Sequence, residues 1–135
     1  MAALNLEIIT PERVVLQAEA ASVTAPGVQG YLGVLPEHAP LITTLQAGVV
    51  TCRRQAGGEE EKLAVSGGFL EAGPDRVIIL ADTAERAAEI DVDRARQARE
   101  RAEQRLRERP PGLDVARAEA ALRRATARLQ AAGVL

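Results

Sequence analysis

Four arginines near the C-terminal end of the 135-residue chain have the residue type and the spacing to bind an anion. Arg94 and Arg101 lie two turns apart on one face if they share a helix. Arg124 and Arg128, spaced i and i+4, also share a face. Guanidinium groups carry forked donors that suit phosphate oxygens. If the two pairs converge, they could bind a phosphorylated ligand.

Residues beside these arginines could contact the base of a nucleotide. Asp91 and the backbone around Ile90 and Ala95 could accept hydrogen bonds from an adenine amino group, and the small side chain of Ala95 leaves room for the ring. The simpler alternative is a solvated helix face, because residues 91–109 interleave seven arginines with five carboxylates. The pattern alone leaves both interpretations open.

Two helices must position the arginines, and the sequence predicts them. Residues 84–109 are rich in Ala, Arg and Glu, which favour helix, and Pro110-Pro111-Gly112 must interrupt it. Asp114 is a good N-cap for a second helix that runs to about Ala132, where Gly133 is a plausible stop.

Apolar residues at heptad spacing predict that the two helices pack as an antiparallel hairpin. On the second helix they are Val115, Ala118, Leu122, Ala125, Leu129 and Ala132; on the first they are Ala95, Ala98, Ala102 and Leu106. Because this seam is mostly alanine, it buries little apolar area. We therefore expect a hairpin that can open.

The first part of the chain has the pattern of short strands separated by Gly and Pro turns. Leu4, Leu6 and Ile8 alternate on one face of the first strand, and Gly67-Gly68 within a later strand predicts a bulge or a close backbone approach. Such strands predict an antiparallel sandwich. The expected fold class is β + α, with an N-terminal β-sandwich over residues 1–84 and a C-terminal two-helix hairpin over residues 85–135.

Charge and composition narrow the function. Residues 1–84 hold ten acidic and five basic residues, whereas residues 85–135 hold nine acidic and twelve basic residues. The two modules are therefore expected to have different functions. Two aromatics, Tyr31 and Phe69, are too few for base stacking, which argues against nucleic-acid binding. Without an apolar run of about 20 residues or a signal peptide, the protein is expected to be soluble.

The remaining reactive residues predict neither an enzyme nor a metal site. His38 and Cys52 are the only histidine and cysteine, and a zinc site needs more nitrogen and sulfur ligands than these two supply. The sequence also contains no pattern that indicates a nucleophile beside an oriented base. We expect His38 to hydrogen-bond locally in a turn and Cys52 to fill space in a strand. The glycines at 27, 30 and 33 lack phosphate-loop spacing and are expected at turns that need positive φ.

Four stretches carry a family resemblance. They are LEIITPERVVLQAEA, GYLGVLPEHAPLITTLQAGVV, LAVSGGFLEAGPDRVIILADTAERAAEID and, overlapping the last, the helix-starting pattern Ile-Asp-x-x-Arg-Ala at residues 90–95. Together they resemble the ε subunit of bacterial rotary F-type ATP synthases, collinearly over essentially the whole chain. The resemblance implies a β-sandwich followed by a helical hairpin, in agreement with the periodicity.

The resemblance also implies a structural and regulatory role in the rotor. The sandwich would dock on the γ subunit and on the ring of c subunits. The hairpin would either fold against the sandwich or extend along γ toward the catalytic α/β head, where it inhibits ATP hydrolysis. The protein would then lie at the cytoplasmic face of the bacterial plasma membrane, held there through the complex.

In several members of this family the folded hairpin binds ATP. The matching positions here are Glu85, Ile90, Asp91, Arg94, Ala95, Arg101, Arg124 and Arg128, and each holds a compatible residue. The resemblance thus predicts ATP as a regulatory ligand, without a metal. ATP would stabilise the folded hairpin in proportion to how much better that state binds it.

Partner contacts are implied at both ends of the chain. The second helix carries one acidic residue, Glu119, and four basic ones: Arg117, Arg123, Arg124 and Arg128. These arginines would complement an acidic loop of the β subunits. In the sandwich, Gln29 and Tyr31 are candidate c-ring contacts, although many relatives carry an acidic residue where Tyr31 stands. Two alternatives are a free-standing adaptor for an acidic protein and a nucleotide sensor outside any rotary complex. Co-purification with γ separates both from the ε interpretation.

Overall fold

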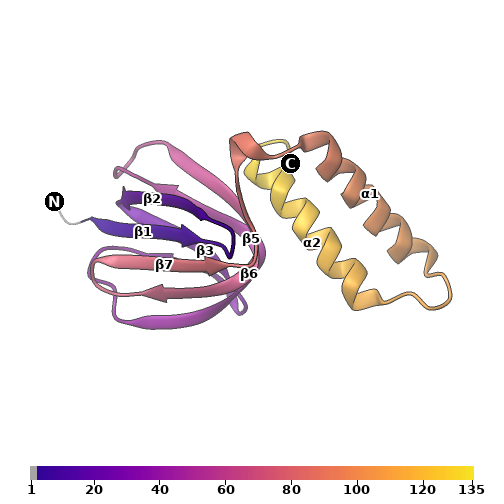
Figure 1. Cartoon of the computed structure of the whole chain (residues 1–135), viewed down its shortest axis with the longest axis horizontal. Helices are drawn as coiled ribbons and strands as arrows, with labels where there is room; N and C mark the ends of the chain where they lie inside the picture. Colours follow the sequence, from indigo (N-terminus) through magenta and orange to yellow (C-terminus); the bar gives the residue numbers. More distant parts are fainter. Residues whose placement is uncertain (1–2) are drawn as a thin grey trace.

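The computed structural model describes residues 3–135, which form a strand-built body with a helical hairpin on one side (Figure 1). The strands are β1 (Leu4–Ile9), β2 (Val14–Ala20), β3 (Ser22–Gly27), β4 (Gly30–Val34), β5 (Leu41–Arg53), β6 (Glu60–Ala72), β7 (Arg76–Ala81) and β8 (Ala84–Arg86). A 3-10 turn, η1 (Ala87–Glu89), leads to α1 (Val92–Glu108) and α2 (Val115–Ala131). The predicted fold class, a β-sandwich followed by a two-helix hairpin, is confirmed.

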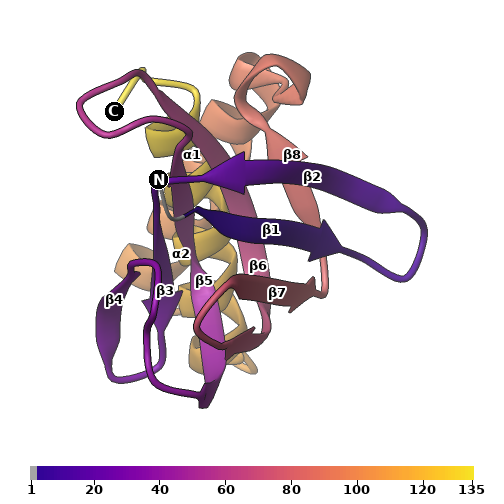
Figure 2. The same cartoon turned by 90° about the vertical axis from the view of Figure 1, so that its left-hand side faces the viewer.

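The strands form one hydrogen-bonded array that folds over on itself (Figure 2). The order is β2-β1-β7-β6-β5-β3-β4, and β8 also pairs with β6. Neighbouring strands are antiparallel except β1 and β7, which run parallel. The two longest strands, β5 and β6, have 13 residues each and link the two layers of the sandwich.

Aliphatic side chains fill the core between the layers. Leu4, Leu6 and Ile8 are at most 1% exposed, so the predicted inner face of β1 is confirmed. Cys52 is fully buried among them, and this burial raises the pKa of its thiol, which leaves it a space-filling residue as expected. Both aromatic side chains, Tyr31 and Phe69, are 57% exposed and stand outside the core.

The glycine predictions are partly right. At Gly68, with φ +132°, a Cβ atom would lie 2.0 Å from the carbonyl oxygen of Leu80, so the close backbone approach is confirmed. Of the three glycines expected at positive φ, Gly30 has it, whereas Gly27 and Gly33 do not. That expectation was wrong because the segment is a β3–β4 hairpin and not an irregular loop.

The first helix begins later than the helix formers from residue 84 predict. Residues 84–86 pair as β8 with Leu63–Val65, on the edge of β6 that β7 leaves open. This pairing outweighs the intrinsic helix propensity of the segment. Asp91 then caps α1, because its Oδ1 accepts a hydrogen bond from the Arg94 backbone N at 3.1 Å.

The second helix and the hairpin seam form as predicted. Asp114 caps α2 by accepting from the Arg117 backbone N at 3.1 Å, and Gly133 follows the helix with φ +78°. The buried seam residues are Ala95, Ala102, Ala118, Ala125 and Leu129. Another face of α2 packs on β5 and β6, so α2 lies between the sandwich and α1 (Figure 1).

Candidate functional site

Three of the eight residues predicted to bind ATP meet where α2 crosses the sandwich. Glu85, Arg124 and Arg128 line one small cavity there. Arg128, in the last turn of α2, donates from Nε to Oε1 of Glu85 on β8 at 2.6 Å. The cavity measures about 10 Å³, which is the space of a single water molecule. In this state the three residues form a contact between hairpin and sandwich, and a nucleotide does not fit between them.

Three further residues of the predicted set lie at the start of α1 and serve its packing. Ile90 is 9% exposed and belongs to a small apolar cluster at the foot of the hairpin. The other members of that cluster are Val49, Ala64, Ala127 and Ala131. Ala95 is buried in the seam against α2, and Asp91 is the N-cap. Ile90 therefore helps to hold the hairpin on the sandwich, whereas Asp91 and Ala95 stabilise the start of α1 and its packing on α2.

The last two, Arg94 and Arg101, are exposed on α1. Within residues 3–135 neither guanidinium group forms a hydrogen bond or an ion pair, so both keep all their donors for a ligand. They do not line the cavity that holds Glu85. The structure thus brings Glu85, Arg124 and Arg128 together and leaves Arg94 and Arg101 open on the neighbouring helix.

The arginines predicted to contact the β subunits divide into two groups. Arg123 and Arg124 line a second cavity of about 380 Å³ between α2 and the sandwich, and Arg128 pairs with Glu85 beside it. Arg117 is exposed in the first turn of α2. Within residues 3–135, Arg128 is therefore the one of the four that pairs with the sandwich in the folded hairpin, whereas Arg123 and Arg124 border the cavity and remain exposed.

Sequence reasoning missed the polar wall of this second cavity. Ser66 and Asp82 belong to it, and Ser66 Oγ accepts hydrogen bonds from the backbone N and the hydroxyl of Thr83 at 3.1 and 2.7 Å. Asp82 follows β7, and a Cβ atom on Gly67 would meet its carboxylate at 3.3 Å. No spacing in the sequence links these residues to Arg123, because only the fold of β6 against α2 brings them there.

Tyr31, a predicted c-ring contact, has a structural role that the sequence does not indicate. Its hydroxyl accepts a hydrogen bond from the backbone N of Val49 at 2.9 Å. The pairing of β3 with β5 shifts between Thr24 and Gly27, and the tyrosine replaces the missing strand partner. Its ring remains exposed, as does Gln29 in the β3–β4 turn, so both can still meet a partner.

The lone histidine makes a local contact. His38 Nδ1 lies 2.6 Å from the carbonyl oxygen of Ala39, which confirms the predicted local hydrogen bond. Within residues 3–135 no group of three or more His, Cys, Asp and Glu side chains is arranged to hold a metal ion. In the same part of the chain, neither helix has the length and apolar character needed to cross a membrane.

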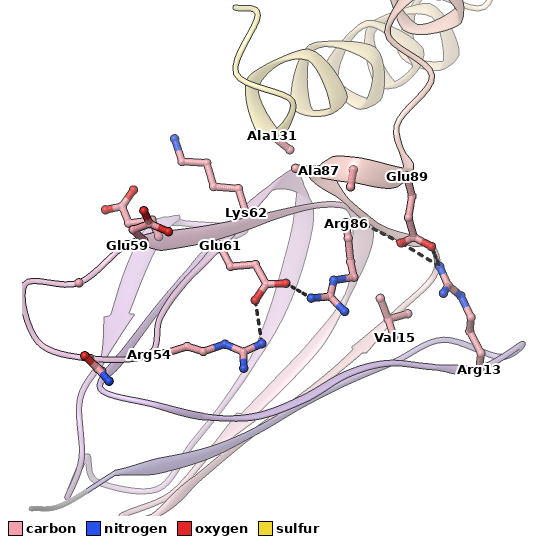
Figure 3. A pocket seen from close by; sticks show the side chains of 14 residues that line it. Arg13, Val15, Arg54, Glu59, Glu61, Lys62, Arg86, Ala87, Glu89 and Ala131 are labelled. Atoms are coloured by element: carbon pink, nitrogen blue, oxygen red, sulfur yellow. Dashed lines mark hydrogen bonds and ion pairs between the residues drawn. The ribbon is translucent and has the colours of Figure 1, made fainter.

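Charged residues surround the segment that leads from the sandwich to the hairpin (Figure 3). They line a cavity of about 1000 Å³ between β2, the β5–β6 turn and residues 86–89. Glu61 accepts from Arg86 and, at 2.9 Å, from Arg54. Glu89 accepts from the Arg86 backbone N at 2.9 Å, and its two carboxylate oxygens accept from Arg13 at 2.9 and 3.1 Å.

These contacts perturb both carboxylates in the same direction. Burial raises the pKa of Glu61, but the hydrogen bonds from Arg54 and Arg86 outweigh it and leave the pKa below its ordinary value. The hydrogen bond from the Arg86 backbone N lowers the pKa of Glu89, partial burial opposes it, and the Arg13 guanidinium lowers it further. Both glutamates are therefore ionised at neutral pH and hold their arginines.

Comparison with known proteins gives consistent matches over the whole chain. Residues 3–87 match the family "ATP synthase, Delta/Epsilon chain, beta-sandwich domain", and residues 88–133 match "ATP synthase, Delta/Epsilon chain, long alpha-helix domain". The chain is 84% identical over 135 residues to an ATP synthase epsilon chain of Moorella thermoacetica, with 100% of both chains covered. It is 55% identical over 128 residues to that of Desulforamulus reducens, which covers 95% of this chain and 96% of the relative.

A solved structure has the same fold. A chain in the cryo-EM structure of the Euglena gracilis mitochondrial ATP synthase, comprising OSCP, F1 and c-ring in rotational state 1, matches with a TM-score of 0.82 and 25% identity. The match covers 98% of this chain and 82% of that one. Sandwich and hairpin therefore recur together in a chain that is part of a rotary complex.

Proposed function

Because this chain belongs to the Delta/Epsilon family of ATP synthase subunits, a non-catalytic part of that complex, we propose that it couples the rotor to the c ring and restrains ATP hydrolysis. The observation that carries the proposal is a full-length family match on a fold whose hairpin is held to the sandwich mainly by small side chains. In this role the chain acts at the cytoplasmic face of the bacterial plasma membrane, bound through its partners.

An exposed apolar row on the sandwich supports docking on the γ subunit. Phe69 pairs across the strands with Leu80, Leu80 with Ile9, and Ile9 with Val14, so the four residues form a continuous row over β6, β7, β1 and β2. Phe69, Leu80 and Val14 are each more than half exposed. A contiguous apolar surface of this kind is characteristic of an interaction site. We assign γ to it.

The β3–β4 hairpin supports a contact with the c ring. Val28 and Gln29 lie at its tip and are exposed, and the Tyr31 ring follows on β4. The hydrogen bond from Val49 to the Tyr31 hydroxyl fixes the ring in place, so the hairpin presents a preformed surface. A partner can bind there without ordering the loop first.

The weak hold of the hairpin supports a second, extended state. Alanines provide most of the buried contacts of α2 with the sandwich, and each methyl contributes on the order of 0.8 kcal/mol, less than half of what a leucine gives. When the hairpin leaves, Arg128 loses its pairing with Glu85, and Arg123 and Arg124 move away from the cavity beside the sandwich. They can then bind acidic side chains of the β subunits and stop hydrolysis.

ATP acts on this equilibrium as a clasp for the folded state. Arg94 and Arg101 on α1 have free donors, and Arg124 and Arg128 lie on the antiparallel partner helix. Because the cavity at Glu85 is too small for a nucleotide, ATP must bind on the open side of the hairpin or displace the Glu85–Arg128 pair. Either way, it stabilises the folded state by its differential affinity.

Co-purification with the γ subunit tests the proposed function. We expect the full chain to bind purified γ and a Phe69→Asp/Leu80→Asp chain to lose that binding, because the two carboxylates disrupt the apolar row. Val134→Asp, an exposed apolar residue after α2, serves as the matched control and should bind normally. Absence of binding by the unaltered chain would instead favour the free-standing adaptor.

A further inference from the structure

Residues 84–89, here called the linker clamp, are held almost entirely by the sandwich. Their backbone continues the array, because Ala84, Glu85 and Arg86 pair with Val65, Ala64 and Leu63 of β6. The hydrogen bond from the Arg86 backbone N to the Glu89 carboxylate closes the 3-10 turn that follows. The segment that joins the two modules is thus a regular part of the first one.

Two ion pairs fasten the clamp to the sandwich by its side chains, and a third holds Glu61, one of their sandwich partners, in place (Figure 3). Glu61 on β6 lies between Arg86 and Arg54, and its side chain is 24% exposed. Arg13, just before β2, binds both carboxylate oxygens of Glu89 from a position 76 residues earlier in the chain. All of these partners belong to the sandwich or to the clamp itself, so none of them lies on α1 or α2.

The contacts of the hairpin begin one residue later. Ile90 has extended backbone angles, φ −78° and ψ 126°, and separates η1 from the capped start of α1. Its side chain packs with Ala127 and Ala131 of α2 in the cluster at the foot of the hairpin. Within residues 3–135, Glu85 is the one residue of the clamp whose side chain pairs with a helix, through Arg128.

We propose that the linker clamp stays on the sandwich when the hairpin lifts away, so that Ile90 is the pivot about which α1 and α2 move. The proposal rests on the proposed function in one respect, namely that the hairpin leaves the sandwich. Lifting breaks the Ile90 cluster and the Glu85–Arg128 pair, whereas β8, Arg86 and Glu89 keep their partners. Asp91 keeps α1 capped during the motion.

The clamp therefore limits the reach of the hairpin. With the clamp closed, the free tether between sandwich and α1 is Ile90 alone. With the clamp open, it would include all residues from 84 onward, at about 3.3 Å per extended residue. Arg13 and Glu61 act here as positioning residues, because they fix where the hairpin starts without touching a ligand.

Amide hydrogen exchange on the full chain tests the clamp. Two variants detach the hairpin independently: Ala127→Glu places a carboxylate in the cluster at its foot, and Arg128→Glu repels Glu85. Spin labels at Gln17 and Gln104 report the detachment as an increased distance. In both variants we expect the amides of residues 84–86 to keep their wild-type exchange rates within about twofold.

Variants of the clamp should show the opposite pattern. Arg13→Gln removes an exposed ion pair and should speed exchange at residues 84–86 about two- to fivefold, whereas Arg13→Lys, which keeps the charge, should have a smaller effect. Glu61→Gln leaves two arginines unpaired and should have a larger effect than Arg13→Gln. The matched control is Arg76→Gln, which breaks the Arg76–Glu71 pair elsewhere on the sandwich and should leave these amides unchanged.

Loss of protection at residues 84–86 in the detached variants would overturn the proposal, because the clamp would then move with the helices. The proposal would also be overturned if Arg13→Gln and Glu61→Gln left the exchange rates of residues 84–86 unchanged. Neither result would bear on γ binding, since the experiment uses the isolated chain. Failure of the clamp and failure of the proposed function are therefore distinguishable.

Discussion

At the scale of single residues, Tyr31 shows how a surface side chain can serve the fold. Its hydroxyl is the acceptor for the buried Val49 N–H, and its ring faces outward. We expect Tyr31→Phe to lower the free energy of unfolding by about 1–3 kcal/mol, because the mutant leaves a backbone donor unsatisfied. Denaturant unfolding measures the change. Gln29→Ala in the same hairpin is the control, and an equally small loss in both variants would contradict this role.

Gly68 is required by the close approach of β6 to β7. A Cβ atom there would lie 2.0 Å from the Leu80 carbonyl oxygen, and the glycine has φ +132°. Gly68→Ala should therefore destabilise the protein by about 1–3 kcal/mol or more in thermal or denaturant unfolding. Gly33→Ala is the matched control, because a Cβ atom added there would meet nothing within 4 Å and its φ is ordinary. Similar stability of the two variants would refute the steric argument.

Glu61 and Glu89 make the stability of the sandwich depend on pH. Because the pKa of each is lower in the folded state, their contribution is present at neutral pH and is lost in acid, as pH falls through the lowered pKa values and both groups become protonated. Glu61→Gln removes one of these groups. The stability difference between wild type and Glu61→Gln should therefore shrink between pH 7 and pH 3 in denaturant unfolding. A constant difference would show that ionisation of Glu61 does not matter.

Residue patterns predicted the caps and the seam of the hairpin but only part of the candidate site. Asp91, Asp114 and Gly133 act locally, within a few residues of their own helix end, so spacing is enough to place them. The Glu85–Arg128 pair joins positions 43 residues apart on two modules, and the sequence alone does not indicate that it forms. The family resemblance predicted both Glu85 and Arg128 as site residues, but it did not predict that they contact each other.

At the scale of elements, pairing with distant strands explains the two segments whose secondary structure the sequence predicts wrongly. The glycines in residues 27–33 suggest a loop, but Gly30 supplies the positive φ of a tight turn and lets β4 pair with β3. The helix formers at 84–86 become β8 because β6 extends beyond β7 and offers an open edge. Neither edge partner is visible in local composition, since both depend on where other strands end.

The hairpin is the element on which the proposed regulation depends. α2 contributes one face to the seam and another to the sandwich, whereas α1 is anchored chiefly through α2 and Ile90. Both contact faces of α2 are rich in alanine, whose small side chains allow close packing but bury little area. The contacts of α2 with α1 and with the sandwich are therefore both modest in buried apolar area, which suits a reversible latch.

At the scale of the whole molecule, the charge asymmetry has a physical counterpart. The acidic sandwich and the basic hairpin meet at Glu85–Arg128 and at the cavity shared by Asp82, Arg123 and Arg124. Opposite net charges favour the folded state, and the attraction weakens as salt screens it. The same basic helix is complementary to any acidic partner that competes with the sandwich.

ATP binding by the isolated chain follows from the proposed clasp. In a calorimetric titration we expect saturable binding that prefers ATP over ADP and GTP and is lost in an Arg94→Ala chain. Arg107→Ala, another exposed arginine of α1, should bind ATP as the wild type does. Absence of binding at millimolar ATP would remove the clasp and leave the arginines as partner contacts.

The most direct test of the central claim is ATP hydrolysis by an F1 complex reassembled with and without this chain. We predict that the full chain lowers hydrolysis, and that an Arg123→Ala/Arg124→Ala chain inhibits less while it still binds γ. A chain with Arg105→Ala and Arg107→Ala, two exposed arginines of α1 outside the proposed contact, is the matched control. Hydrolysis that is the same with and without the full chain would contradict a regulatory role for the hairpin.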